Sequence, residues 1–200
     1  MRLYYHLVYP HLSNTYLVVS ETTKEGLLID PGSLDLHLVE TIEKNGYSIA
    51  GVLTTLHSPP YTDGLLTLMR VYPSVQVFSA EKMFYNCPCV SIQDGDVLDL
   101  AGFKVEVIGM PAYAREAVWY KIGSIVFTGA VLTTGMIGPT TNLYVRALLI
   151  GRIRQYFTQW EPETLLFPGY GPPTKAGLEL RFNADLNTPS LKTLNSVPLP

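Results

Sequence analysis

Two side chains in the segment Val52–Leu65 have the chemistry to bind a metal ion, namely His57 and Asp63. Zinc and related ions take imidazole, thiolate or carboxylate ligands, and their protein sites use three or four of them. His57 and Asp63 alone do not complete such a set. Three interpretations of His57 therefore stand: a loop histidine held by local hydrogen bonds, a residue that contacts a ligand, and one ligand of a remodelled metal site.

Other kinds of chemistry find little support in the sequence. The glycine-any-serine-any-glycine pattern of a nucleophile elbow is absent. The segment Gly169–Gly171 is too short to form a phosphate-binding loop. Arg146, Arg152 and Arg154 do not make a basic stripe without further basic residues, and the net charge is −3. We therefore expect no nucleic-acid partner.

The strands that position the segment are predicted from hydrophobic patterns. Short runs rich in apolar, aromatic and β-branched residues, bounded by turn residues, indicate strands. Ile49–Leu56 is nearly continuously apolar, as expected for a strand covered on both faces. The predicted strands are Leu3–Tyr9, Tyr16–Ser20, Gly26–Asp30, Ile49–Leu56, Val75–Ser79, Val97–Leu100, Phe103–Ile108, Ala117–Ile122, Ser124–Phe127 and Thr164–Phe167.

Three helices are predicted from apolar residues that recur on one face, together with capping and stop residues at the ends. The third is the longest, with apolar residues four positions apart from Val145 to Phe157. The helices are expected to begin at Ser33, at Thr62 or Asp63, and at about Thr141, and to end at Asn45-Gly46, before Pro73 and at about Trp160.

The order of these elements predicts the fold class. Strands with two helices are followed by strands with one long helix, which indicates two sheets packed face to face with helices outside. We therefore expect a four-layer αββα sandwich formed by residues 1–200 as one domain, with residues 183–200 as a tail that wraps the surface or is loose. A doubly wound sheet is the alternative, and the hairpin-like runs in Val97–Phe127 count against it.

Further segments extend the pattern beyond residues 52–65. They are Asn14–Val18, Leu27–Gly32, Gly95–Ile108, Gly109–Tyr113, Val126–Ala130 and Leu166–Thr174. Their order and spacing resemble the metallo-β-lactamase superfamily, and the compact glyoxalase II-like hydrolases in particular, from about Asn14 to Asn183. The resemblance implies the αββα fold.

The resemblance also implies where a two-metal centre would lie. In the family seven positions carry histidine or aspartate. The matching positions here carry Leu56, Ser58, Pro60, Tyr61, Tyr113, Ala130 and Tyr170. Leucine, proline and alanine offer no donor, serine is a poor one, and tyrosine ligates as phenolate, which its pKa near 10 makes costly. The resemblance therefore implies a member without the metal centre, and we expect no metal and no other cofactor.

Two functions follow from this interpretation. The leading one is a pseudoenzyme, a non-catalytic binding or assembly module, with no catalytic residue assigned. The alternative is a glyoxalase II-like hydrolase of esters, thioesters or lactones with a remodelled site.

Asp30 is expected to be a turn aspartate that bonds nearby backbone. The residues expected to contact a small molecule in the former metal pocket are His57, Ser58, Tyr61, Asp63, Tyr113, Ala130 and Tyr170.

The three tyrosines in that set leave two possibilities open. They either line a pocket for a small molecule or fill the space that ions and water would occupy. In both cases the resemblance implies that they converge, although they come from distant segments of the chain. Replacement by alanine is expected to be costly for a filler and tolerated for a pocket wall.

Composition and the N-terminal segment bear on localisation and partners. Met1–Leu12 is interrupted by Arg2, two histidines and a proline, which argues against a signal peptide. No run approaches the roughly 18 apolar residues of a membrane span. We therefore expect a cytoplasmic protein without a membrane partner.

Charged residues make up only 16% of the chain and the mean hydropathy is +0.17. We therefore expect a homodimer or a protein partner, with Leu3–Tyr9 and the tail as contacts.

Overall fold

The computed structural model of the chain describes residues 1–9, 11–85 and 87–187. Two six-stranded sheets form its centre. In the first, the strands lie in the order β1 (Arg2–Val8), β2 (Ser13–Val19), β3 (Glu25–Ile29), β4 (Ser48–Leu53), β5 (Gln76–Ser79) and β8 (Val90–Ser91). In the second, the order is β16 (Thr174–Lys175), β15 (Leu165–Pro168), β12 (Ile125–Gly129), β11 (Val118–Ile122), β10 (Phe103–Gly109) and β9 (Val97–Leu100).

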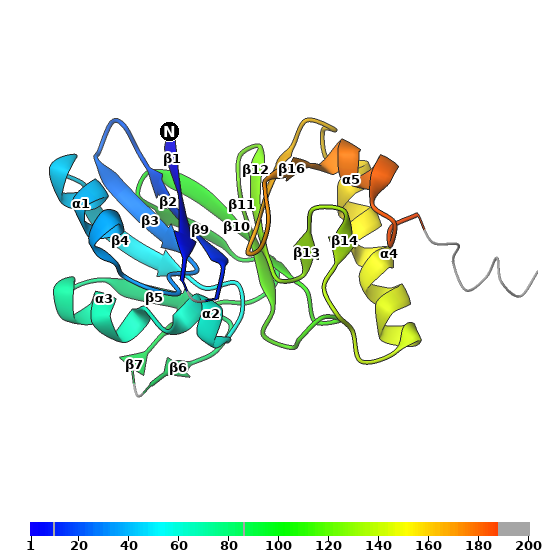
Figure 1. The fold of residues 1–200 in the computed structure, drawn as a ribbon, viewed down its shortest axis with the longest axis horizontal. Coiled ribbons are helices and arrows are strands. Elements are labelled where there is room, and N and C mark those ends of the chain that lie inside the picture. The colour runs from blue at the N-terminus through cyan, green and yellow to red at the C-terminus, as the bar shows by residue number, and fades with distance from the viewer. Residues whose placement is uncertain (10, 86, 188–200) are drawn as a thin grey trace, which may run out of the picture.

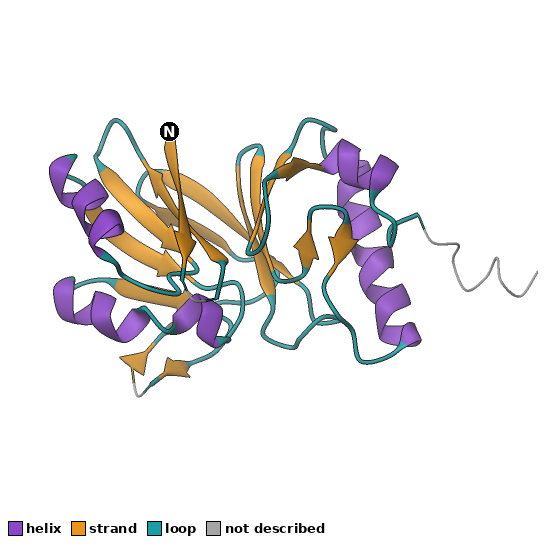
Figure 2. Cartoon of the chain, in the orientation of Figure 1, coloured by secondary structure: helices purple, strands orange, loops and turns teal. Residues whose placement is uncertain are grey.

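Helices cover the outer face of each sheet (Figures 1 and 2). α1 (Leu36–Lys44) and α3 (Leu65–Val71) lie on the first sheet, while α4 (Leu143–Gln159) and α5 (Ala176–Phe182) lie on the second. α4 has 17 residues and is the longest of them, and the short α2 (Pro59–Thr62) lies near the junction of the two sheets. The order of layers is therefore helix, sheet, sheet, helix.

Three apolar clusters fill the spaces between these layers. One lies between the sheets and contains Tyr16 and Phe127; another joins α1 and α3 to the first sheet; the third joins α4 to the second sheet and contains Trp119. The central strands are buried on both faces, as their continuous apolar sequences predict. The αββα sandwich is confirmed, and the doubly wound alternative is wrong because β9–β12 form an antiparallel meander.

The predicted helix starts need correction. Asp35, not Ser33, caps α1, since its carboxylate accepts a hydrogen bond of 3.0 Å from the Leu38 N–H. The predicted second helix is two helices, and neither is capped by Thr62 or Asp63. α2 begins directly after Ser58 because prolines 59 and 60 have a backbone φ suited to a first helical turn. α3 begins only after Gly64.

The predicted strand Ile49–Leu56 also ends early, because β4 stops at Leu53. The next two residues cross toward the second sheet, and the Thr55 carbonyl accepts a hydrogen bond of 2.9 Å from the Val118 N–H. Elements of two to seven residues escaped prediction because they are too short to show a periodic pattern. They are β6 (Met83–Phe84), β7 (Cys87–Pro88), β8, β13 (Leu132–Thr133), β14 (Met136–Ile137), β16 and α5.

The tail from residue 183, which was expected to wrap the surface or to be loose, is packed at its start. Asn183 is buried, its Oδ1 accepts hydrogen bonds from the N–H groups of Asp185 and Leu186, and Leu186 lies in the apolar cluster under α4. Residues 188–200 lie outside the described part of the chain. No helix in the described ranges is long and apolar enough to cross a membrane.

Candidate functional site

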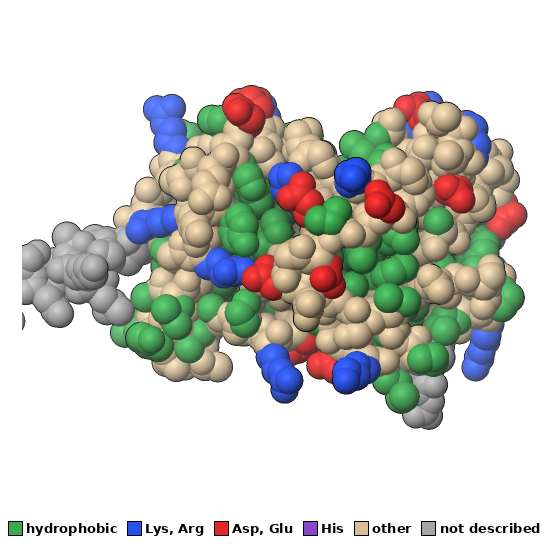
Figure 3. Space-filling view, turned by 180° about the vertical axis from the view of Figure 1, so that it is seen from behind, with side chains coloured by type: hydrophobic (Ala, Val, Ile, Leu, Met, Phe, Trp, Pro, Cys, Tyr) green, Lys and Arg blue, Asp and Glu red, His purple; other side chains and the backbone are tan. Residues whose placement is uncertain are grey.

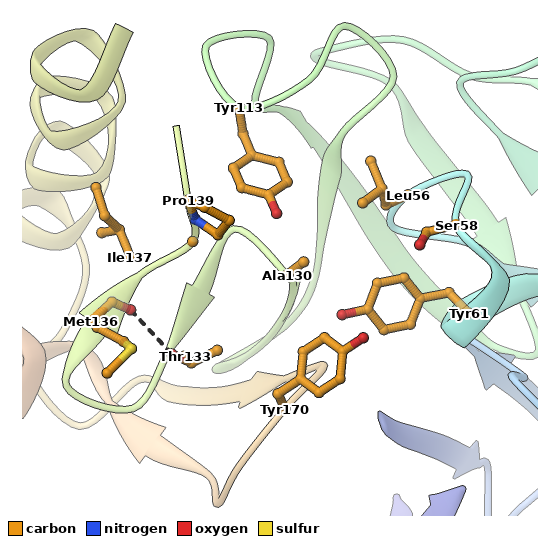
Figure 4. Close-up of a pocket in the computed structure, with 11 residues that line it drawn as sticks. Leu56, Ser58, Tyr61, Tyr113, Ala130, Thr133, Met136, Ile137, Pro139 and Tyr170 are labelled. Atoms are coloured by element: carbon orange, nitrogen blue, oxygen red, sulfur yellow. Dashed lines mark hydrogen bonds between the residues drawn. The ribbon is translucent and has the colours of Figure 1, made fainter. Parts of the chain in front are cut away.

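The loops that follow β4, β10, β12 and β15 meet around a cavity of about 300 Å³ (Figure 4). The hairpin of β13 and β14 forms one further side. Because these loops come from both sheets, only the complete sandwich brings them together. The residues that line the cavity are Leu56, Ser58, Tyr61, Tyr113, Ala130, Thr133, Met136, Ile137, Gly138, Pro139 and Tyr170.

Tyr61 lies deepest among the tyrosines of the cavity. Its position in α2 follows from Ser58 and the two prolines that begin this helix. The side chain is only 1% exposed, and its hydroxyl passes so close to Gly169 that a Cβ added there would lie 2.3 Å from the oxygen. Burial, and then the nearby Asp30 carboxylate, raises the pKa of Tyr61 far above its usual value. Tyr61 therefore stays a neutral phenol.

Tyr113 and Tyr170 lie beside Tyr61 and are only partly buried. The rings of Tyr61 and Tyr170 have centroids 5.8 Å apart. Tyr113 packs against Gly138, where an added Cβ would lie 2.6 Å from the tyrosine ring. Burial also raises the pKa of Tyr113. The hydroxyls of all three rings point toward one region of the cavity (Figure 4), so the expected convergence is found.

The two expected roles of the tyrosines divide between them. Tyr61 fills interior space, because its ring is buried and packed against Gly169. Tyr113 and Tyr170 form walls of an open cavity. The distinction could not be made from residue type, because all three are tyrosines that follow strands.

Most of the seven positions at which the family resemblance implies metal ligands lie at this cavity. Six of the seven line it, and the seventh, Pro60, does not. The Pro60 carbonyl instead accepts a hydrogen bond of 2.8 Å from the Ser13 hydroxyl, and it packs so closely on Gly32 that a Cβ added there would lie 2.0 Å from its oxygen. The expected contact residues Ser58, Tyr61, Tyr113, Ala130 and Tyr170 are therefore brought together.

His57 and Asp63, which were expected in the same pocket, do not line it. His57 is exposed, and its ring packs edge-on against Phe84 with centroids 4.4 Å apart. The Asp63 carboxylate accepts a hydrogen bond of 3.1 Å from Tyr85 and lies 3.5 Å from the His11 ring nitrogen. Both side chains point away from the cavity because α2 turns its buried face, which carries Tyr61, toward it.

The donors at the cavity do not fit the two-metal centre of the family. Its lining has hydroxyls and apolar groups, and burial raises the pKa of the Tyr61 and Tyr113 phenols, which disfavours the phenolate that a metal would need. Across residues 1–9, 11–85 and 87–187, no group of three or more histidine, cysteine, aspartate or glutamate side chains could hold a metal ion. The lining therefore lacks the ligands that a metal-dependent step would need.

A polar frame supports the loops that carry the cavity residues, and we define it as Asn14, Tyr16, Asp30 and Thr55. Both carboxylate oxygens of Asp30 accept hydrogen bonds of 2.7 Å from Thr55, one from its N–H and one from its hydroxyl. Gly129 packs directly on the Thr55 side chain. This contact positions Leu56 and Ala130, the residues that follow Thr55 and Gly129. Asp30 was predicted to bond nearby backbone; its partners are instead in the loop after β4.

The other half of the frame holds the loop that carries Tyr170. The Asn14 Nδ2 donates to the carbonyls of Pro168 and Gly171, both at 2.8 Å, and the Tyr16 hydroxyl donates to Pro168 at 2.6 Å. Burial raises the pKa of Tyr16, which keeps this hydroxyl a donor. From the sequence, the segment around Tyr170 was recognised only as part of a motif. Its hydrogen bonds to Asn14 and Tyr16 could not be predicted, because they join residues more than 150 positions apart.

The β13–β14 hairpin is the part of the site that sequence reasoning missed. Two carboxylates from the C-terminal region hold it: Glu179 accepts from the Gly135 N–H at 3.1 Å, and Asp185 accepts from the Ile137 N–H at 2.8 Å. Gly135 has a positive φ of 85°. The glycine in the two-residue loop Thr134-Gly135 is a weak signal for a hairpin, and strands of two residues are too short to be predicted alone.

Several known proteins are similar to this chain in sequence, although no family model matches it. A relative in Treponema pallidum, an uncharacterised protein, is 32% identical over 178 residues, which are 87% of this chain and 93% of the relative. A hydroxyacylglutathione hydrolase of Buchnera aphidicola is 27% identical over 56% of this chain, and one of Prochlorococcus marinus is 25% identical over 62%. These alignments span 44% and 52% of the two hydrolases, about half their length.

Solved structures share the fold. ETHE1 from Myxococcus xanthus superposes with a TM-score of 0.82 at 20% identity, over 100% of this chain and 92% of its own. The BLEG-1 B3 metallo-β-lactamase superposes with a TM-score of 0.79 at 18% identity, over 93% of this chain and 100% of its own. At these identities the likeness is evidence for the arrangement of layers and not for the chemistry of the site.

Proposed function

This chain belongs to the metallo-β-lactamase superfamily, and we propose that within it the chain acts as a non-catalytic binding or assembly module. The observation that carries the proposal is the cavity at the superfamily's metal position. Its walls are formed by leucine, serine, alanine and tyrosine side chains at six of the positions where the resemblance implies metal ligands. The space at the metal position is thus present, but the side chains around it are not the histidines and aspartates of the family.

The same lining supports a non-catalytic role in a second way. Hydrolysis needs an activated water or nucleophile, which requires a metal or a general base. Tyrosines are the sole titratable side chains of this lining, and burial raises the pKa of Tyr61 and Tyr113. A neutral phenol is a hydrogen-bond donor and a poor base. The Ser58 hydroxyl therefore has no neighbour in the lining that would take its proton.

A hydrolase of glyoxalase II type with a remodelled site is the alternative function. The intact polar frame favours it, because Asp30 and Thr55 still hold the loop after β4 in one defined conformation. Relatives named hydroxyacylglutathione hydrolase align over about half their length. This alternative requires that a thioester or ester be cleaved by the side chains of the cavity itself.

Metal analysis tests the proposal most directly. Protein purified without added metal should contain well under one equivalent of zinc, iron or manganese by plasma mass spectrometry. Its thermal midpoint should not move with chelator, because only a metal bound by the native state would add stability. Stoichiometric metal that disappears in a His57→Ala variant would contradict the proposal, since His57 and Asp63 are the metal-competent side chains of the segment Val52–Leu65.

Activity measurements separate the two functions. Hydrolysis of thioester, lactone, β-lactam and phosphodiester substrates should stay at background. Turnover that survives a second purification and is lost in Tyr113→Phe would favour the remodelled hydrolase. Tyr144→Phe is the matched control, because Tyr144 is exposed on α4 and does not line the cavity.

The assembly half of the proposal concerns the surface. Figure 3 shows apolar side chains in patches among charged ones on the face opposite to that of Figure 1. β1 is an edge strand, and Tyr5 and Tyr9 at this edge are exposed. An open strand edge with apolar side chains favours pairing with another chain. We expect a homodimer or a dedicated protein partner; a strict monomer in light scattering would contradict the homodimer.

A further inference from the structure

The lining of the cavity has two chemically different sides (Figure 4). Hydroxyls of Ser58, Tyr61, Tyr113 and Tyr170 lie on one side. The other side is the β13–β14 hairpin, with apolar side chains such as Met136 and Ile137. The Thr133 hydroxyl on this hairpin is already engaged, since it donates to the Met136 carbonyl at 3.4 Å. Free hydrogen-bonding capacity is therefore concentrated on the side of the tyrosines.

No residue of the lining is charged at neutral pH. Burial raises the pKa of Tyr61 and Tyr113, which keeps these two phenols protonated. A carboxylate or an ammonium group entering the cavity would lose hydration without meeting an opposite charge in the lining, and this weakens its binding. The cavity therefore selects against ions of either sign.

The Tyr61 hydroxyl is a buried polar group that makes no well-formed hydrogen bond within the described part of the chain, although its interaction with the Tyr170 hydroxyl contributes to its raised pKa. Its oxygen is fully buried. Such groups are rare in folded proteins, because an unpaired buried donor is destabilising. This hydroxyl lies at the cavity, beside the more exposed Tyr170.

We infer that the cavity binds an uncharged ligand with a carbonyl or alcohol head and a short apolar body. The head would accept hydrogen bonds from the tyrosine hydroxyls, and the body would lie against Met136 and Ile137. A volume of about 300 Å³ is at the lower end for ligand pockets, so the ligand is small. This inference rests on the proposed function and names the ligand class for the same site.

A matched set of one-ring probes tests the ligand class by ligand-observed NMR on the full chain. Acetophenone and benzyl alcohol are neutral with a polar head, toluene lacks the head, and benzoate and benzylammonium are charged. We expect acetophenone and benzyl alcohol to bind with a Kd of about 1–10 mM, as fragments of this size do. The charged probes should bind at least about tenfold more weakly.

Variants show where and how the probes bind. Met136→Trp should block all the neutral probes, and it is compatible with folding because Met136 is 57% exposed. Tyr113→Phe should weaken acetophenone about fivefold, which corresponds to one neutral hydrogen bond, and leave toluene unchanged. Tyr144→Phe, outside the cavity, should change nothing. Unchanged thermal midpoints would establish that each variant is folded.

Several outcomes would overturn the inference. They are benzoate or benzylammonium binding as tightly as acetophenone, no binding of either neutral polar probe, and acetophenone binding that Met136→Trp leaves intact. In each case a metal content below one equivalent and background hydrolysis would leave the proposed function standing. Stoichiometric metal with turnover would instead overturn the proposed function, whichever probe binds.

Discussion

The polar frame and the cavity lining are neighbours in the structure, yet they differ in how completely their polar groups are satisfied. In the frame, the Asp30 carboxylate takes two hydrogen bonds from Thr55, and Asn14 donates to two loop carbonyls. In the lining, the buried Tyr61 hydroxyl makes no hydrogen bond within the described residues. The conformation of the loops therefore depends on the hydrogen bonds of the polar frame. We expect that side chains of the lining can be substituted while the loops stay in place.

This difference explains how the cavity can be present although its lining residues do not form a set of metal ligands. The frame bonds join segments that are far apart in the chain, and none of them involves a former ligand position. Side chains at those positions can therefore differ without breaking the hydrogen bonds that hold the loops. Substitutions in the lining and substitutions in the frame should therefore have different effects.

The largest effect is expected from Tyr61→Ala. Deleting a buried large aromatic side chain typically lowers the free energy of unfolding by about 3–5 kcal/mol. Tyr61 is 1% exposed, so the full cost applies. The matched variant Tyr113→Ala should cost less than about 2 kcal/mol, because that ring is partly exposed and buries less area. Equal losses for the two variants in urea unfolding would contradict the assignment of Tyr61 as a filler and Tyr113 as a wall.

Asp30→Asn should remove a pH dependence of stability. Burial raises the pKa of Asp30 from 3.8 to about 7, despite the two hydrogen bonds from Thr55, which lower it. Between these values the folded chain keeps a proton that the unfolded chain has lost. Stability therefore falls as pH rises from about 4 to about 7, by up to about 4 kcal/mol, and is constant above that.

An asparagine side chain does not titrate in that range, so the Asp30→Asn variant should lack this decrease while keeping an oxygen for the Thr55 N–H. Unfolding free energies measured from pH 4 to pH 8 give the test. Parallel pH profiles for the two proteins would show that Asp30 is ionised over this whole pH range. Other groups of the frame would then offset the cost of burying its charge.

Asn14→Ala should have an intermediate effect. It removes the donor for the carbonyls of Pro168 and Gly171, and we expect a loss of about 2–3 kcal/mol because buried acceptors are left with fewer partners. Tyr16→Phe, which removes a single bond to Pro168, should cost about 1 kcal/mol. A fully stable Asn14→Ala variant with unchanged acetophenone binding would show that the frame does not position the loop of Tyr170.

The smallest effect is expected for Ser58→Ala. Ser58 occupies the N-cap of α2 without a capping side-chain bond, so its loss should change stability by less than about 0.5 kcal/mol. Asn142→Ala on α4 is the matched control, because Asn142 accepts from the Val145 N–H at 2.9 Å and its loss should cost about 1 kcal/mol. A larger cost for Ser58→Ala than for Asn142→Ala in thermal unfolding would contradict this ranking.

The sequence by itself determined the layers and the neighbourhood of the site. Continuous apolar strands, helices with one apolar face and the order of these elements indicated the αββα sandwich. The family resemblance implied that Tyr61, Tyr113 and Tyr170 converge, and all three line one cavity in the structure. Local signals failed at helix starts: Ser33 and Asp35 are both good caps, and the choice depends on which side chain reaches a free N–H.

Tertiary structure alone decided which of the candidate residues belong to the cavity. His57 and Asp63 lie close to Tyr61 in the sequence, but α2 directs Tyr61 inward and leaves them exposed. The hairpin wall depends on Glu179 and Asp185, which come from more than forty positions later in the chain. The burial of Asp30, which raises its pKa, results from packing between segments that are distant in sequence. Local residue patterns cannot predict that packing.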